Sequence, residues 1–256
     1  MITRASIAKA NRIVVKVGSS SISGANAAQL DLLVEALAQL HKAGKQVILV
    51  TSGAIATGLP LFGIEAKPDD LPTAQALAAV GQSRLIARYQ SSLERFNIIA
   101  GQVLLTAADL EETETSDNAK RAMERLLELR VIPIVNENDT TATAEIRFGD
   151  NDRLAALVSG LLEVDLLVLL SDVDALYTSN PTDPDAKRIE SVNFDDDLDW
   201  VEIGGTGSQV GTGGAQTKVQ AAKLAGASGI PVLLTKTALV SDAMNGNDVG
   251  TWFEQR

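Results

Sequence analysis

Two lysines lie beside glycines, in positions where they could bind a phosphate group. Lys16 interrupts an apolar run and is followed by Gly18, while Lys218 ends the segment GTGGAQTK, which begins at Gly211. Glycines let main-chain N–H groups approach an anion closely, and the N-terminus of a following helix favours negative charge. Each lysine also has an ordinary interpretation, either as a side chain that reaches solvent from a sheet edge or as a lysine that begins an exposed helix.

An acidic and amide-rich connection follows the apolar run VIPIV, which ends at Val135, and precedes the apolar run LAALVSGLL. The connection contains only two basic residues, Arg147 and Arg153. A solvated acidic loop would have the same composition, so the segment alone leaves its purpose open. Its carboxylates and amides are Asn136, Glu137, Asn138, Asp139, Glu145, Asp150, Asn151 and Asp152.

Several expected strands end in small or polar residues. The endings are KVGSSS (16–21), TSGAIATG (51–58), NEND (136–139) and SDVD (171–174). In an open parallel sheet, ligands bind outside the carboxyl ends of the strands. A single Gly/Ser ending is often only a turn, but four endings at one edge of a sheet indicate a binding site.

The elements that would position these residues alternate along the chain. Apolar runs at 12–18, 46–53, 98–105, 131–135, 165–172 and 230–236 predict strands, and GTWF at 250–253 follows a short helix. Helices are expected over 26–43, 72–96, 116–130 with Ser116 as the cap, 151–163 and 215–227, and a looser acidic segment over 179–211. This alternation predicts an α/β fold with a mostly parallel sheet covered on both faces, as a single domain over 1–256.

Composition excludes several classes of protein. The net charge of −11 argues against broad nucleic-acid binding, and the chain has no cysteine and one histidine, His41. A histidine-based triad and an HExxH zinc site are therefore not expected. A P-loop is not expected either, because the sequence contains no GxxxxGK(S/T) motif. We also find no run of roughly 20 apolar residues and no signal-peptide core, so we expect a cytoplasmic protein without a membrane span.

Motifs along nearly the whole chain resemble one family. VVKVGSSS, VTSGAIATG, AAVGQSRL, VNENDTTATAEIRFGDNDRLAALV, LSDVDALYT, VGTGGAQTK and VGTWF are similar, in order and spacing, to the glutamate 5-kinase branch of the amino acid kinase family. The resemblance implies a three-layer sandwich whose central sheet has eight mostly parallel strands and helices on both faces. It also implies phosphorylation of the γ-carboxylate of L-glutamate by ATP with Mg²⁺, which begins proline synthesis.

The resemblance further implies roles for individual residues. Asp139 would bind the substrate ammonium, Asn151 would donate to the α-carboxylate, and Ser52 and Asn136 would complete the substrate site. Lys16 and Lys218 would stabilise the moving phosphoryl group, and Asp152 would hold both lysines. The nucleotide site would comprise Lys16, Gly18, Ser171, Asp172, Thr212, Gly213, Gly214, Ala215, Gln216, Thr217 and Lys218. No residue is assigned as a metal ligand, because Mg²⁺ is expected to bind mainly to the ATP phosphates.

Further properties are common in the family, and some alternatives remain open. A homo-oligomer is expected from the resemblance alone, and feedback inhibition by proline is common in the family but is not derivable from this sequence. Many members continue into a C-terminal PUA domain, whereas this chain ends just after GTWF, and its glycine-rich loop has AQT where MST is expected. The alternatives are another kinase of this fold, acting on aspartate, N-acetylglutamate, carbamate or a nucleoside monophosphate, and a non-catalytic sensor of glutamate or proline.

Overall fold

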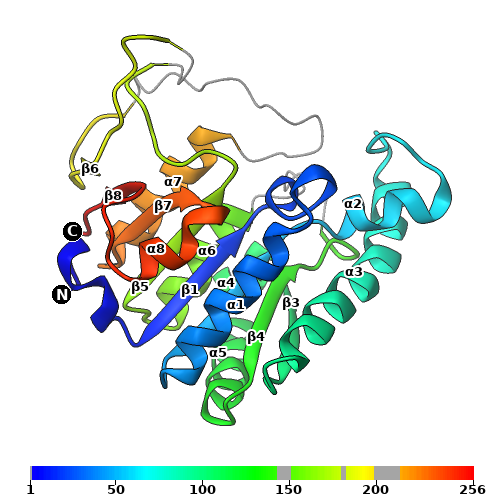
Figure 1. Ribbon diagram of the computed structural model, residues 1–256. Helices are drawn as coiled ribbons and strands as arrows, with labels where there is room; N and C mark the ends of the chain where they lie inside the picture. Colours follow the sequence, from blue (N-terminus) through cyan, green and yellow to red (C-terminus); the bar gives the residue numbers. More distant parts are fainter. Residues whose placement is uncertain (1, 143–150, 180–182, 199–213) are drawn as a thin grey trace.

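Eight strands form one central sheet in the order β3-β4-β2-β1-β5-β7-β8-β6 (Figure 1). The computed structural model describes residues 2–142, 151–179, 183–198 and 214–256. Neighbouring strands run parallel except β7 and β8, which are antiparallel. The strands are β1 (Arg12–Val17), β2 (Gln46–Thr51), β3 (Ala100–Leu105), β4 (Ile132–Glu137), β5 (Leu166–Ser171), β6 (Ser191–Val192), β7 (Val232–Lys236) and β8 (Thr251–Phe253).

Helices cover both faces of this sheet, which confirms the predicted three-layer α/β architecture (Figure 1). The α-helices are α1 (Gln29–Lys42), α2 (Ala54–Gly58), α3 (Leu71–Glu94), α4 (Ala107–Glu111), α5 (Thr113–Glu128), α6 (Asn151–Leu161), α7 (Ala215–Ala227) and α8 (Val240–Met244). Short 3₁₀ helices are η1 (Arg4–Lys9), η2 (Ser19–Ser21), η3 (Gly24–Asn26), η4 (Leu59–Phe62) and η5 (Thr237–Leu239). In the described part of the chain, no helix combines the length and the apolar character that crossing a membrane requires.

The two faces of the sheet belong to two separate hydrophobic cores. Successive strand side chains point to opposite faces, and in β1 Val15 joins one core while Val14 joins the other. The first core includes residues of α1, α3 and α8, and the second includes residues of α5, α6 and α7. Because both faces are buried, the central strands read as continuous apolar runs rather than as alternating ones.

The carboxyl ends of the parallel strands meet at one edge of the sheet. Register pairs Val17 with Thr51 and with Leu170, and Ser171 with Lys236. The chain therefore brings segments that are far apart in the sequence to one rim, which is where the sequence analysis placed the binding site.

Local signals predicted two elements incorrectly. Helix α5 begins at Thr113 rather than near Ser116, because the Glu112 side chain caps it by accepting a hydrogen bond from Thr115 N at 3.0 Å. Strand β6, which contains only Ser191 and Val192, lies within the segment expected to be irregular. A strand this short has no usable periodicity, and its pairing with β8 is a tertiary contact.

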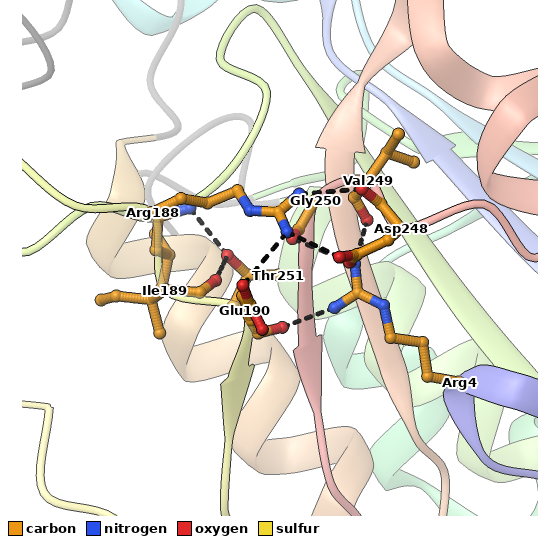
Figure 2. Close-up of polar contacts among 9 residues, drawn as sticks. Arg4, Arg188, Ile189, Glu190, Asp248, Val249, Gly250 and Thr251 are labelled. Carbon is orange, nitrogen blue, oxygen red and sulfur yellow. Dashed lines mark hydrogen bonds and ion pairs between the residues drawn. The ribbon is translucent and has the colours of Figure 1, made fainter.

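Polar contacts hold the β8–β6 edge to the N-terminal segment (Figure 2). Asp248, just before β8, pairs with Arg4 at 2.6 Å and with Arg188 at 3.1 Å. Arg4 also donates to the main-chain oxygens of Glu190, at 2.6 Å, and Val249, at 2.7 Å. Since the Asp248 side chain is largely exposed, each ion pair contributes at most about 1 kcal/mol, and the main-chain contacts give this edge its geometry.

Candidate functional site

A buried cluster of two lysines and one aspartate lies at the rim. Lys16 Nζ is 2.7 Å from Asp152 Oδ1, and Lys218 Nζ is 3.2 Å from Asp152 Oδ2. Thr217 Oγ1 donates to the same Oδ2 at 2.9 Å. All three charged side chains are buried. The predicted contact of Asp152 with both lysines is thereby confirmed.

Three elements bring these charges together. Lys16 has the same parity in β1 as Val14, so it faces the side of the sheet covered by α6 and α7. Asp152 lies in the first turn of α6, where the helix dipole favours a negative charge, and Lys218 lies in the first turn of α7. Two buried ammonium groups and one carboxylate thus meet at this rim, within a protein whose net charge is −11.

The lysines keep Asp152 ionised. Burial alone would raise the pKa of its carboxyl group, but the charge of Lys16 and then that of Lys218 outweigh burial, so the pKa is well below its usual value. A carboxylate held in this way remains negative across the physiological range and can position both ammonium groups.

Two glycine turns border the lysine cluster. Gly18 lies directly after β1, and a Cβ atom at this position would be 3.8 Å from Lys16 Nζ. Gly53 follows β2 with φ of 110°, in the left-handed region that favours glycine, and a Cβ atom there would be 3.1 Å from Ser19 Cβ. The turns after β1 and β2 therefore pack closely, with the partly buried Ser52 between β2 and Gly53.

A chain of buried amides occupies the other part of the rim. Asn151 Nδ2 donates to Asn136 Oδ1 at 2.7 Å and also to the main-chain oxygen of Thr51. Asn136 Oδ1 accepts a second bond from Glu137 N at 2.9 Å. The ends of β2 and β4 and the start of α6 are thus joined, so Asn136 and Asn151, both assigned to the substrate site from the sequence, are in direct contact.

This geometry corrects the predicted role of Asn151. From the sequence, the Asn151 side chain was expected to donate to a substrate carboxylate. Both N–H bonds of Nδ2 are instead directed at protein oxygens, those of Thr51 and Asn136. The buried Oδ1 has no hydrogen-bond partner among the described residues, so Asn151 presents an acceptor.

Asp139 lies two residues beyond β4 and is partly buried. Burial raises the pKa of its carboxyl group to about 6, and the charge of Lys67 lowers it in part. Asp139 is thus a carboxylate that binding of a further cation would stabilise. Lys67 was not identified from the sequence, because it lies in the connection before α3, away from every motif.

The remaining predicted nucleotide residues lie at the ends of β5 and the start of α7. Ser171 is buried and donates to Asp172 Oδ1 at 3.1 Å, while Asp172 is exposed. Gly214 is the N-cap of α7, and Ala215, Gln216 and Thr217 form its first residues. Thr212, Gly213, Glu145 and Asp150 lie outside the described residues.

Gln82, on α3, was not identified from its type and spacing. Its Oε1 accepts from Asn136 Nδ2 at 2.7 Å, and the side chain is buried. The sequence held one signal. Gln82 lies four residues after Ala78 and three before Leu85, so it shares their apolar face of the helix, and all three are buried. A polar residue on an apolar helix face requires a partner.

Comparisons with known proteins agree with this arrangement. Residues 11–236 match the model of the amino acid kinase family. A glutamate 5-kinase of Clavibacter michiganensis subsp. michiganensis is 65% identical over 254 residues, which cover 99% of this chain and 98% of that protein. A glutamate 5-kinase of Streptomyces coelicolor is 51% identical, with 98% and 68% covered.

Two solved structures share the fold at low sequence identity. Carbamate kinase from Giardia lamblia bound to AMP-PNP superposes with a TM-score of 0.69 at 17% identity, covering 97% of this chain and all of that one (100%). UMP kinase from Bacillus anthracis gives 0.65 at 14% identity, with 96% of each chain covered. Both likenesses concern the architecture, since side chains at this identity are largely different.

Proposed function

Because the chain belongs to the amino acid kinase family and, within it, to the glutamate 5-kinases, we propose that it phosphorylates the γ-carboxylate of L-glutamate with ATP. The product would be L-glutamyl 5-phosphate, the first intermediate of proline synthesis from glutamate. The observation that carries this proposal is the division of one rim into two parts. Two buried lysines held by Asp152 lie in one part, and buried amides with a carboxylate of raised pKa lie in the other.

The chemistry requires positioning and charge stabilisation rather than proton transfer. A γ-carboxylate is already ionised at neutral pH, so one of its oxygens can attack the γ-phosphorus directly. The new O–P bond forms as the bond to the β–γ bridging oxygen breaks, and the electron pair leaves with ADP. Lys16 and Lys218 stabilise the charge that moves between these oxygens, and Asp152 holds both lysines in place.

Mg²⁺ is expected to bind the ATP phosphates rather than a protein cage. Both oxygens of Asp152 already contact lysines, and the described residues contain no group of three or more candidate metal-binding side chains. Bound in this way, Mg²⁺ would neutralise phosphate charge, as it does in other phosphoryl-transfer sites.

Asp139 favours an acceptor that carries an ammonium group. An ammonium beside Asp139 would stabilise the ionised carboxylate that burial disfavours. N-acetylglutamate and nucleoside monophosphates lack that ammonium, so their kinases are less consistent with this pocket, whereas aspartate retains it. A non-catalytic sensor is less consistent too, since it would not require the buried lysine cluster.

A hydroxylamine assay tests the proposed reaction. The purified protein is incubated with MgATP, hydroxylamine and one acceptor, and both ADP release and hydroxamate are measured. We expect ATP-dependent hydroxamate with L-glutamate, and a much lower kcat/KM with N-acetyl-L-glutamate, which leaves a buried charge without its partner. Absence of hydroxamate with L-glutamate would reject the function, and equal kcat/KM for both acceptors would reject the role of Asp139.

Several wider properties stay predictions. A homo-oligomer is expected by family resemblance, feedback inhibition by proline is common in that family, and a cytoplasmic location and a single domain over 1–256 are expected from the sequence. Size-exclusion chromatography coupled to light scattering, and assays with added proline, test the first two of them.

A further inference from the structure

A row of polar residues on α3 contacts the rim from one side. Gln75, Gln82 and Tyr89 are seven residues apart, close to two helical turns, so they lie on one face of the helix. Gln75 Nε2 donates to the main-chain oxygen of Ala142 at 3.2 Å, and the hydroxyl of Tyr89 is 2.8 Å from Thr51 Oγ1. With the Gln82–Asn136 bond, α3 contacts the ends of both β2 and β4.

These contacts close into a ring of elements. From Tyr89 on α3 the contacts pass to Thr51 on β2, whose main-chain oxygen accepts from Asn151. Asn151, at the start of α6, donates to Asn136 on β4, and Asn136 donates back to Gln82 on α3. The amides of the acceptor side are thus enclosed between α3 and α6.

The direction of every hydrogen bond in the amide chain is determined. Asn136 Oδ1 accepts from Glu137 N and from Asn151, so Asn136 Nδ2 must donate. Gln82 must therefore present Oε1 to Asn136, and its Nε2 becomes a buried donor with no hydrogen-bond partner among the described residues. This row of hydrogen-bonded amides therefore ends in a donor, Gln82 Nε2, on one side and in an acceptor, Asn151 Oδ1, on the other.

Two glycines, Gly81 and Gly58, allow α3 to pack closely enough for Gln82 to reach the rim. A Cβ atom at Gly81 would be 1.8 Å from the main-chain oxygen of Ala54, and one at Gly58 would be 2.3 Å from that of Leu77. Helices α2 and α3 therefore lie in backbone contact, which any larger residue would prevent. Since α2 follows the turn at Ser52 and Gly53, the residue after Gly81 is placed directly against the site.

We propose that Gln82 is a positioning residue of the acceptor pocket, which holds Asn136, and through it Asn151, in the orientation that binds the amino-acid substrate. The inference deepens the proposed glutamate kinase activity and rests on it. Gln82 acts through Asn136 and does not touch the lysine cluster. Its loss should therefore weaken binding of glutamate without slowing phosphoryl transfer at saturation.

The first test compares Gln82→Met with the unaltered protein in the hydroxamate assay. Methionine has a similar length but cannot accept the bond from Asn136. We expect the KM for glutamate to rise about tenfold or more, with kcat and the KM for ATP changed by less than about threefold. Calorimetric titration of glutamate without ATP should show the same loss of affinity.

The second test uses Gln82→Glu, which retains an oxygen acceptor for Asn136. When protonated, the introduced carboxyl also has an O–H donor, so it matches the hydrogen-bonding capacity of glutamine. We expect its KM for glutamate to be closer to that of the unaltered protein than to that of Gln82→Met at pH 6.5–7. Gln90→Glu, an exposed change on the same helix, is the matched control and should leave all constants unchanged.

The outcomes separate this inference from the proposed function. If the unaltered protein forms no glutamyl hydroxamate, the function itself fails. If it does, the inference is overturned when Gln82→Met keeps the normal KM for glutamate. It is also overturned when Gln82→Met impairs both substrates together with a large fall in melting temperature, or when Gln82→Glu is as impaired as Gln82→Met at every pH.

Discussion

Two carboxylates at one rim have opposite environments. Asp152 is buried against Lys16 and Lys218, which lower its pKa, whereas burial raises the pKa of Asp139 to about 6 and Lys67 offsets this only in part. The phosphoryl side is therefore charge-paired before any substrate binds. The acceptor side has a carboxylate that becomes favourable when an ammonium arrives. From this difference we propose that the first carboxylate organises catalysis and that the second selects the substrate.

The largest expected effect is on stability, from Asp152→Asn. The change removes the carboxylate that both buried lysines contact, and breaking a buried ion pair costs about 3–5 kcal/mol. Urea unfolding at pH 7 measures the loss. Glu111→Gln is the control, since Glu111 pairs with the neighbouring Arg153 at 2.6 Å but both side chains are exposed, which limits its effect to about 1 kcal/mol. Equal losses for the two variants would contradict the view of a preorganised cluster.

Lys16→Ala should next lower kcat, by a factor on the order of 10² or more, as for loss of a preorganised charge-stabilising group. Lys218→Ala should behave similarly, and the double variant should be less than additive because both lysines act on one charge. Steady-state kinetics after a melting check measure this, with the exposed Lys42→Ala as control. A normal kcat with only a raised KM for glutamate would move Lys16 to the acceptor side.

Asp139→Ala should raise the KM for glutamate by about tenfold or more while the KM for ATP stays within about twofold. The reason is that Asp139 would bind the ammonium equally well in the ground state and in the transition state, so its loss weakens binding rather than catalysis. The same kinetics measure both constants. Thr140→Ala, an exposed neighbour, is the matched control. A large fall in kcat with unchanged KM would show that Asp139 participates in phosphoryl transfer and would erase the distinction between the two carboxylates.

A smaller effect is expected from pH. Asp139 must be ionised to pair with an ammonium, so at pH 5, one unit below its pKa of about 6, only about a tenth of the sites are competent. The kcat/KM for glutamate should fall about tenfold between pH 7 and 5. The step should disappear in Asp139→Asn and persist in His41→Asn, whose ring lies at the end of α1.

The linked effects on stability have opposite signs. Because the folded pKa of Asp139 is raised, its contribution to stability is present below about pH 4 and is lost as the pH rises through about 6. The folded pKa of Asp152 is lowered, so its contribution is present above about pH 4 and is lost only as the pH falls further. Asp139→Asn should therefore stabilise the free protein at pH 8 and not at pH 4, which thermal melts can measure.

Much of this arrangement followed from local pattern. The helix over 215–227 was predicted with the boundaries that α7 has, and the strand endings at Lys16, Ser52, Asn136 and Ser171 lie at one rim. Apolar periodicity and Gly/Ser endings are properties of short segments, so they are readable without tertiary contacts. The cap at Glu112 was missed because several neighbouring polar residues, Ser116 among them, could also cap the helix. Strand β6 was missed because it depends on pairing with β8.

By itself, the sequence determined the α/β class, the rim and the lysines that lie on it. Only the tertiary structure divided the acidic connection between two tasks. Asn151 and Asp152 are consecutive, yet one joins Asn136 on the acceptor side and the other joins the lysines. Successive helical residues point about 100° apart, so a run that looks like one cluster in the sequence faces two sites. The contact of Gln82 with Asn136, 54 residues away, exists only because α3 packs against that rim.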